Sequence, residues 1–338
     1  MLILYSLLLL AALAVILAGA ELFTNSLEHV GQRFHLSEGL VGSVFAAVAT
    51  ALPETVVPII AVFFGGHDAT VGESVGVGAI LGSPLMLVTL ALALVALFTG
   101  SQRGWNQPLK PEFSGMVRDL GYFTVAYSIA LMSLFVPRSS GVPAMTGLCL
   151  VFLYGYYVFN TIQASARLVR HGHGTRAEQP LRLQRLGLPH NLGLELLQLL
   201  AGVVLIIVGA KLFVMGVEEI AARTGLSALV LSLVVVPIAT EMPEKFNSIL
   251  WVRRGKDTLA FGNLTGAMVF QGTLLLAFGM QLSSWAPSRD LLWTMAITLG
   301  MALWTLFLTL RRRLTPASLL LNGAAYLLFL LVIFGLGA

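Results

Sequence analysis

GAELFTNSLEHVGQRFHLSEGLVGSVFAAVATALPE, residues 19–54, occurs a second time 190 positions later as GAKLFVMGVEEIAARTGLSALVLSLVVVPIATEMPE, residues 209–244. The two stretches align without a gap and are identical at 13 of 36 positions. Apolar composition alone would match leucines, but the identical positions also include charged residues, hydroxyls and prolines: Glu28/Glu218, Arg33/Arg223, Ser37/Ser227, Thr50/Thr240, Pro53/Pro243 and Glu54/Glu244. The chain therefore contains an internal repeat.

The repeat continues after each glutamate, where GAILGSPLMLVTLALAL (78–94) aligns with GNLTGAMVFQGTLLLAF (262–278) at a shift of 184. Glycines recur four residues apart in both segments, at Gly78 and Gly82 and at Gly262 and Gly266. Small residues at this spacing allow helices to approach closely. We expect these glycines to pack against other helices, with local unwinding at an ion path as the alternative.

The composition is that of a membrane protein. The chain is 57% hydrophobic and 11% charged, whereas soluble domains carry about 25% charged residues. Its mean hydropathy is +0.88, and apolar runs of about 20 residues recur without the alternation of a membrane barrel. The single cysteine, Cys149, excludes an internal disulfide and is expected to be buried. The runs predict ten spans, at 2–25, 37–64, 73–98, 118–136, 142–164, 192–216, 226–251, 259–281, 289–310 and 316–336.

The positive charges predict the orientation of these spans. Of the 20 Lys and Arg residues, 15 fall in alternate loops that include the basic stretch 166–191, and only three fall in the opposite loops: Arg138, Arg223 and Arg289. The basic loops are predicted to be cytoplasmic, which places both termini outside. The first apolar segment continues past the length of a signal peptide, so we interpret it as a span.

The predicted organisation is a first repeat of five spans (1–165), a cytoplasmic basic linker (166–191) and a second repeat of five spans (192–338). An odd number of spans makes the second repeat enter the membrane from the opposite face. Such inverted repeats bind their substrate near the membrane midplane, where interrupted helices of the two halves meet. His171, His173 and His190 lie in the linker, and we interpret them as part of a solvated loop rather than a metal site.

Charged residues lie in the middle of the seventh predicted span, in ATEMPEK (239–245). A charge at the centre of a span costs roughly 2.5–3.5 kcal/mol on insertion scales, so its presence indicates a function. Glu244 has a repeat partner, Glu54, and a proline precedes each. Proline kinks a helix and frees carbonyl oxygens, which together with carboxylates form the oxygen-rich cage that hard cations require. The alternative for a single glutamate is a buried structural acid.

These motifs resemble those of a known family. ATALPE and ATEMPE resemble the G-T-S-L-P-E motif of the cation/calcium exchanger superfamily, and GNLTGAMVFQ resembles that family's G-N-x-x-G-S-N-I-F-N motif, of which GAILGSPLML is a weaker version. The resemblance implies an all-α polytopic membrane protein with ten transmembrane helices, arranged as two inverted five-helix repeats. It also implies cation antiport, without a cofactor, in which cytosolic Ca²⁺ is exported against Na⁺ or H⁺.

The resemblance also implies a set of cation ligands. Glu54 and Glu244 correspond to the central ligands, Thr50 and Thr240 to oxygen donors at the kinks, and Ser83 to the serine of the glycine-rich motif. The last motif position, polar in the family, is Gln271 in the second half and Leu87 in the first. Glu241 and Ala51 replace the serine before L-P-E, and Ala267 replaces the counterpart of Ser83. The predicted metal-site residues are Glu54, Glu244, Thr50, Thr240, Ser83, Gln271 and Glu241.

Lys245 follows Glu244 where the family has an apolar residue, which leaves calcium affinity and the number of coupled ions open. Glu241 and Lys245 are four residues apart, so they share a helix face and can form an ion pair. The alternative is that Lys245 extends along its span towards the cytoplasmic interface.

The leading hypothesis is a Ca²⁺/Na⁺ antiporter of a prokaryotic plasma membrane that works by alternating access. Proton-coupled exchange, with Glu241 as the extra titrating group, is the second. An intramembrane enzyme would need a nucleophile or a His or Cys ligand at the depth of the glutamates, and the sequence offers none. A non-transporting membrane scaffold is a further alternative. Expected partners are membrane lipid and the transported cations, not nucleic acid; the oligomeric state stays open, and one chain can be sufficient.

Overall fold

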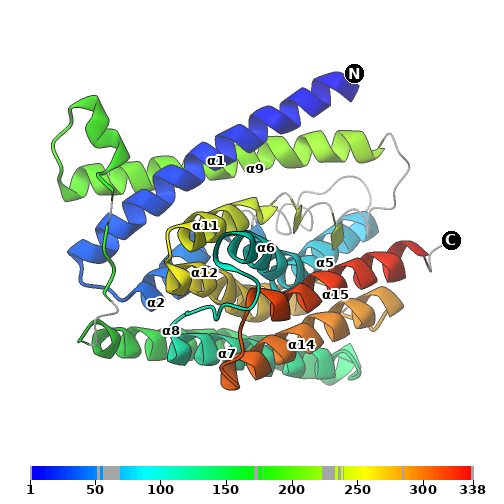
Figure 1. Cartoon of the computed structure of the whole chain (residues 1–338). Helices are drawn as coiled ribbons and strands as arrows, with labels where there is room; N and C mark the ends of the chain where they lie inside the picture. The colour runs from blue at the N-terminus through cyan, green and yellow to red at the C-terminus, as the bar shows by residue number, and fades with distance from the viewer. Residues whose placement is uncertain are drawn as a thin grey trace.

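The protein is a bundle of helices (Figure 1). The structure, a computed structural model, describes residues 2–51, 54–55, 69–170, 174–177, 179–222, 233–234, 237–238, 240–283 and 285–335. These residues contain one isolated β-bridge and no β-strand. The helices are α1 (Leu2–Arg33), α2 (Glu38–Leu40), η1 (Val41–Ala46), α3 (Ala47–Thr50), α5 (Ala69–Met86), η2 (Leu87–Ala91), α6 (Leu92–Arg103), α7 (Phe113–Ser133), η3 (Arg138–Ser140), α8 (Val142–Arg170), η4 (Arg182–Leu186), α9 (Leu192–Ala222), α11 (Met242–Arg253), α12 (Asp257–Phe270), η5 (Gln271–Leu275), α13 (Leu276–Leu282), α14 (Arg289–Leu310) and α15 (Pro316–Gly335).

Seven helices within the described ranges are long and apolar enough to cross a membrane. They differ in burial: the most apolar window of Asp257–Gln281 is 94% buried, whereas that of Val142–Ala166 is 22% buried. The span formed by α12, η5 and α13 is therefore central, and α8 is peripheral. The second and seventh predicted spans run through residues that the structure does not describe, so the number of ten spans stays a prediction.

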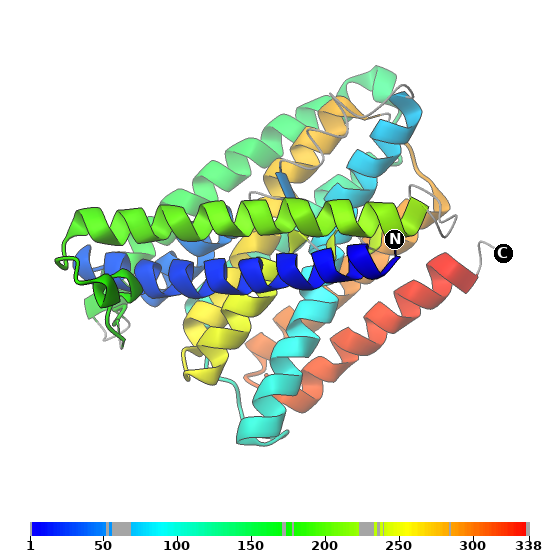
Figure 2. The same ribbon diagram turned by 90° about the horizontal axis from the view of Figure 1, so that it is seen from above.

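Helices α1 and α9 correspond to each other in the sequence repeat and pack side by side along their length (Figures 1 and 2). They run antiparallel, as inverted repeats require. Gly19 lies against the backbone nitrogen of Ile206, and Gly209 lies against Ile16. These two contacts are equivalent under the shift of 190, so the sequence repeat is also a repeat of packing.

A second pair of equivalent contacts lies in the centre of the bundle. A Cβ atom on Gly82 would lie 2.5 Å from the carbonyl oxygen of Leu233, and one on Gly266 would overlap the backbone of Ser43. Leu233 is the repeat partner of Ser43, and Gly266 that of Gly82. Only glycine permits this approach, which confirms the expected packing for Gly82 and Gly266.

Two π-helices also occupy equivalent positions. η2 begins at Leu87 and η5 begins at Gln271, which are matched by the shift of 184. Single-turn π-helices inside α-helices are frequently found at functional sites. The paired distortion marks the position at which the family motif carries its last polar residue.

The outer faces of the peripheral helices are apolar. On α8, the side chains of Leu148, Phe152 and Phe159 are all exposed. Cys149 is also exposed, so its predicted burial was wrong: it lies on a face of α8 that none of the described helices covers. Lys211 on α9 is exposed as well. In a multi-pass membrane protein lipid covers such faces.

Candidate cation-binding site

The helices that carry the two central glutamates break at equivalent residues. Helix α3 ends at Thr50, and Ala51 has φ −78° and ψ 8°. Helix α11 begins at Met242, and Glu241 has φ −87° and ψ 6°. Ala51 and Glu241 are repeat partners, so both helices depart from helical geometry three residues before a glutamate. The predicted kinks are therefore present; Pro243 lies in the first turn of α11, and Pro53 lies outside the described residues.

Both central glutamates are buried: the exposed fraction is 2% for Glu54 and 0% for Glu244. Among the described residues, Thr50 is the one side chain that offers a hydroxyl to either carboxylate, and it lies beside Glu244. The Glu54 carboxylate is close enough to interact electrostatically with Glu244, Glu241 and Lys245. Two buried carboxylates that repel each other and share a single hydroxyl neighbour form a site suited to a cation, because an unpaired buried charge is costly.

Thr50 provides a hydroxyl next to the Glu244 carboxylate. Its Oγ1 donates to the Ala46 carbonyl oxygen at 2.9 Å, so the hydroxyl oxygen keeps a lone pair for a cation. Thr240, its repeat partner, is also buried. The structure thus brings the threonines of both breaks into the buried centre with the glutamates.

Lys245 is buried with an exposed fraction of 4%, and its Nζ lies 3.2 Å from Oε2 of Glu241. This is the ion pair predicted from the spacing of four, and the alternative in which Lys245 extends to the interface is wrong. The same Nζ lies 3.2 Å from Sδ of Met86 and 3.5 Å from the carbonyl oxygen of Pro237. Ser83 lies beside the Glu241 carboxylate.

Gln271 begins η5 and is fully buried. Neither its amide nitrogen nor its amide oxygen has a hydrogen-bond partner among the described residues. An uncommitted amide oxygen is a suitable ligand for Na⁺ or Ca²⁺. Its partner Leu87, at the start of η2, is also buried and cannot ligate. The amide group on this level of the bundle therefore comes from the second repeat.

Two buried asparagines near Glu244 were not predicted from the sequence. Asn247 lies three residues further along α11, and both polar atoms of its side chain are buried without a partner in the described chain. Asn263 donates through Nδ2 to the Glu244 carbonyl oxygen and to Oγ of Ser248, each at 3.1 Å, and so fixes α11 against α12. A polar residue on the helix face of a site glutamate is the signal that could have identified Asn247.

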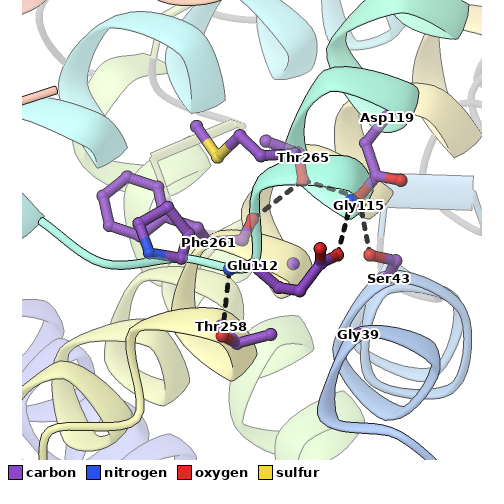
Figure 3. Close-up of a pocket in the computed structure, with 11 residues that line it drawn as sticks. Gly39, Ser43, Glu112, Gly115, Asp119, Thr258, Phe261 and Thr265 are labelled. Atoms are coloured by element: carbon purple, nitrogen blue, oxygen red, sulfur yellow. Dashed lines mark hydrogen bonds between the residues drawn. The ribbon is translucent and has the colours of Figure 1, made fainter. Parts of the chain in front are cut away.

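A separate polar pocket lies between the start of α7, η1 and α12 (Figure 3). Oδ2 of Asp119 accepts hydrogen bonds from Oγ of Ser43 at 2.6 Å and Oγ1 of Thr265 at 2.9 Å. Oδ1 accepts from the Tyr157 hydroxyl at 3.1 Å and pairs with Arg118 at 3.3 Å. Because donors surround this carboxylate, its arrangement is that of a structural link between the two repeats rather than of a cation ligand.

The linker histidines give no comparable site. His171 and His173 lie outside the described residues. Nε2 of His190 lies 2.9 Å from Oε1 of Glu195, and His29 lies beside His190. These three residues could surround a metal ion, but the Arg33 guanidinium binds both Glu195 oxygens, at 2.7 to 3.1 Å. That carboxylate is already neutralised, which disfavours a bound cation.

Comparison with known proteins shows that the chain is similar to transporters. The family described as sodium/calcium exchanger protein matches residues 4–163 and 194–335. The protein named "Putative antiporter CaxA" from Alkalimonas amylolytica is 25% identical over 95% of this chain and 97% of its own length. Inner membrane protein YrbG of Escherichia coli is 25% identical over 80% of this chain and 77% of its own.

A solved structure shows the same fold. The sodium-calcium exchanger NCX_Mj, soaked with Na⁺ and Sr²⁺, superposes with a TM-score of 0.73 and covers 97% of this chain and 98% of its own, at 20% sequence identity. The all-helical, polytopic fold expected from the sequence is therefore confirmed.

Proposed function

The chain belongs to the sodium/calcium exchanger protein family, and from this premise we propose that it exports Ca²⁺ in exchange for Na⁺ by alternating access. As a member of this family it is a multi-pass membrane transporter of cations and not an enzyme, and the exchanged ions are its substrates rather than cofactors.

One observation supports the proposal most strongly: Glu54 and Glu244 are repeat partners, both are buried, and the Thr50 hydroxyl is the one side-chain donor beside them in the described chain. Each follows a break in its helix. A carboxylate that merely stabilised the fold would be surrounded by donors, as Asp119 is. A transported cation compensates these two charges and is released when the helices around them move.

The surrounding oxygens favour a hard cation. Thr50, Thr240, Ser83 and Gln271 offer hydroxyl and amide oxygens, and Ca²⁺ takes six to eight oxygen ligands while Na⁺ accepts the same donor type. No thiolate or imidazole lies in the two broken spans, so a soft transition metal is a poor fit. We assign Glu54 and Glu244 the central role and the four neutral residues a supporting one.

Proton-coupled exchange is the second candidate, and Glu241 favours it. This third buried acid has no counterpart in the first repeat, where Ala51 stands. A carboxylate that does not itself hold the cation can carry a proton across instead. Its pairing with Lys245 at 3.2 Å favours a Glu241 carboxylate that stays ionised. For this reason we prefer Na⁺-coupled exchange to proton-coupled exchange.

The proposed location is the plasma membrane of a prokaryote, with both termini outside. The support is the distribution of Lys and Arg in the loops. In this orientation the linker is cytoplasmic, and the export direction runs from the linker side to the side of the termini.

Flux into proteoliposomes tests the proposal. The purified protein is reconstituted, and gradients of Ca²⁺, Na⁺, K⁺ and pH are imposed one at a time. We expect an outward Na⁺ gradient to drive ⁴⁵Ca²⁺ uptake that stops when the gradient is dissipated. Uptake driven only by a pH gradient would establish the proton-coupled alternative, and the absence of uptake under every gradient would contradict transport.

A further inference from the structure

We propose that the ammonium group of Lys245 is a permanent cation of the binding site, so that the protein exchanges one divalent cation for two monovalent cations without moving net charge. The inference rests on the proposed exchange of Ca²⁺ and adds its stoichiometry and its independence of membrane potential.

Lys245 connects the two repeats. Its side chain leaves α11 in the second repeat and reaches Met86, the last residue of α5 in the first repeat, at 3.2 Å. The same Nζ atom also lies 3.2 Å from the Glu241 carboxylate and 3.5 Å from the Pro237 carbonyl oxygen. The ammonium therefore has a carboxylate and a carbonyl as neighbours at the level of the helix breaks, as a bound monovalent cation would.

The charged residues of the spans around the site determine its net charge. Apart from Glu38 at the start of the first, the predicted spans 37–64 and 226–251 contain four charged residues: Glu54, Glu241, Glu244 and Lys245. The predicted spans that carry Ser83 and Gln271, 73–98 and 259–281, add only Glu73, at the start of the first. With three carboxylates ionised and one ammonium, the site has a net charge of minus two.

The net charge of the site determines how many cations it binds, because an uncompensated buried charge is costly. An uncompensated charge in a low-dielectric interior is strongly unfavourable, so the occupied site changes its accessibility from one side to the other most readily when it is neutral. One Ca²⁺ neutralises it, and two Na⁺ neutralise it equally. The occupied site is then neutral in both half-cycles, so neither half-cycle moves net charge across the membrane. Without the lysine, the same three acids would require three monovalent cations.

The wild-type protein tests the inference directly. Proteoliposomes with a fixed Na⁺ gradient are clamped with K⁺ and valinomycin at inside-negative, zero and inside-positive potentials, and ⁴⁵Ca²⁺ flux is measured. We expect the same initial rate at all three potentials. At balance, the Ca²⁺ ratio should equal the square of the Na⁺ ratio whatever potential is imposed.

Two variants test the role of the charge. Lys245→Met leaves a net charge of minus three, so the remaining exchange should depend on the potential and move one net charge in each cycle. Glu241→Gln combined with Lys245→Met restores minus two and should return exchange to independence of the potential. Lys211→Met removes a lysine from an exposed position on α9 and is the matched control, which should behave as the wild type.

The outcomes separate the inference from the proposed function. Wild-type exchange that depends on the potential would overturn the inference while leaving Ca²⁺ exchange intact. Potential-independent exchange by Lys245→Met, or potential-dependent exchange by the double variant, would overturn it too. If Lys245→Met is inactive, the potential dependence of exchange by the wild type and by the double variant still tests the inference. Absence of any exchange by the wild type would instead refute the proposed function.

Discussion

Gly266 lies directly against the backbone of Ser43, and no side chain fits between them. The contact joins α12 of the second repeat to η1 of the first. Gly266→Ala should force the two helices apart. Overpacking of this kind costs about 1–3 kcal/mol, so we expect a lower melting temperature in detergent and a loss of transport.

Gly300→Ala is the matched control for this prediction. Gly300 lies within α14, and a Cβ atom there would meet no atom within 4 Å. Because alanine favours a helix over glycine by about 1 kcal/mol, the control should melt at the wild-type temperature or slightly above it. Equal melting temperatures for the two variants would show that the protein has room for a side chain between Gly266 and Ser43.

Asp119 should stabilise the contact between the repeats. Asp119→Asn removes the charge that Ser43 and Thr265 bind at 2.6 and 2.9 Å. Hydrogen bonds to a charged group contribute about 1.5–3 kcal/mol, so thermal unfolding should occur at a lower temperature. In a double-mutant cycle with Thr265→Val, the double variant should lose less stability than the sum of the losses of the two single variants. Strict additivity would indicate that the two side chains do not interact.

The predicted topology places the linker and the loop between α13 and α14 on opposite sides of the membrane. Arg185 in the linker and Pro287 in that loop are both exposed. In a background with Cys149→Ser, a membrane-impermeant maleimide applied to intact cells should label Pro287→Cys and not Arg185→Cys. Lysis should then make Arg185→Cys reactive. Labelling of both from outside would refute the ten-span arrangement.

Asn247 should contribute to cation affinity. Its amide is buried and uncommitted within the described chain, three residues beyond Glu244 on α11. Asn247→Ala removes one neutral oxygen, so the KM for Ca²⁺ should rise several-fold while the protein remains folded. Phe246→Leu, at the adjacent half-buried position, is the control. An unchanged KM for Asn247→Ala would exclude this amide from the site.

Much of the fold was predictable because the sequence repeats. Glu54 and Glu244 are a pair, and the pairing itself indicated that both lie at the same depth. The spacing of four between Glu241 and Lys245 indicated the ion pair, but its reach to Met86 depends on how the repeats pack. Contacts between helices that are distant in the sequence leave no periodic signal along either one.

The residues that were missed have no repeat partner of the same kind. Asn247 corresponds to Val57, so comparing the halves could not identify it. Asp119 lies at the start of a span, where an acid is commonly solvated, and its burial follows from three other helices that converge on it. Cys149 was expected inside because it is apolar; in a membrane protein, however, apolar residues also face lipid.

The most direct test of the central claim is Na⁺-driven ⁴⁵Ca²⁺ uptake by proteoliposomes containing Glu54→Gln or Glu244→Gln. Each variant removes one of the two repeat-related carboxylates while keeping the shape of the side chain. We predict that both elute from a sizing column like the wild type and transport no Ca²⁺, because one remaining central carboxylate cannot compensate the dehydration of a divalent cation. Near-normal uptake by either variant would contradict the claim that these two glutamates form the cation site.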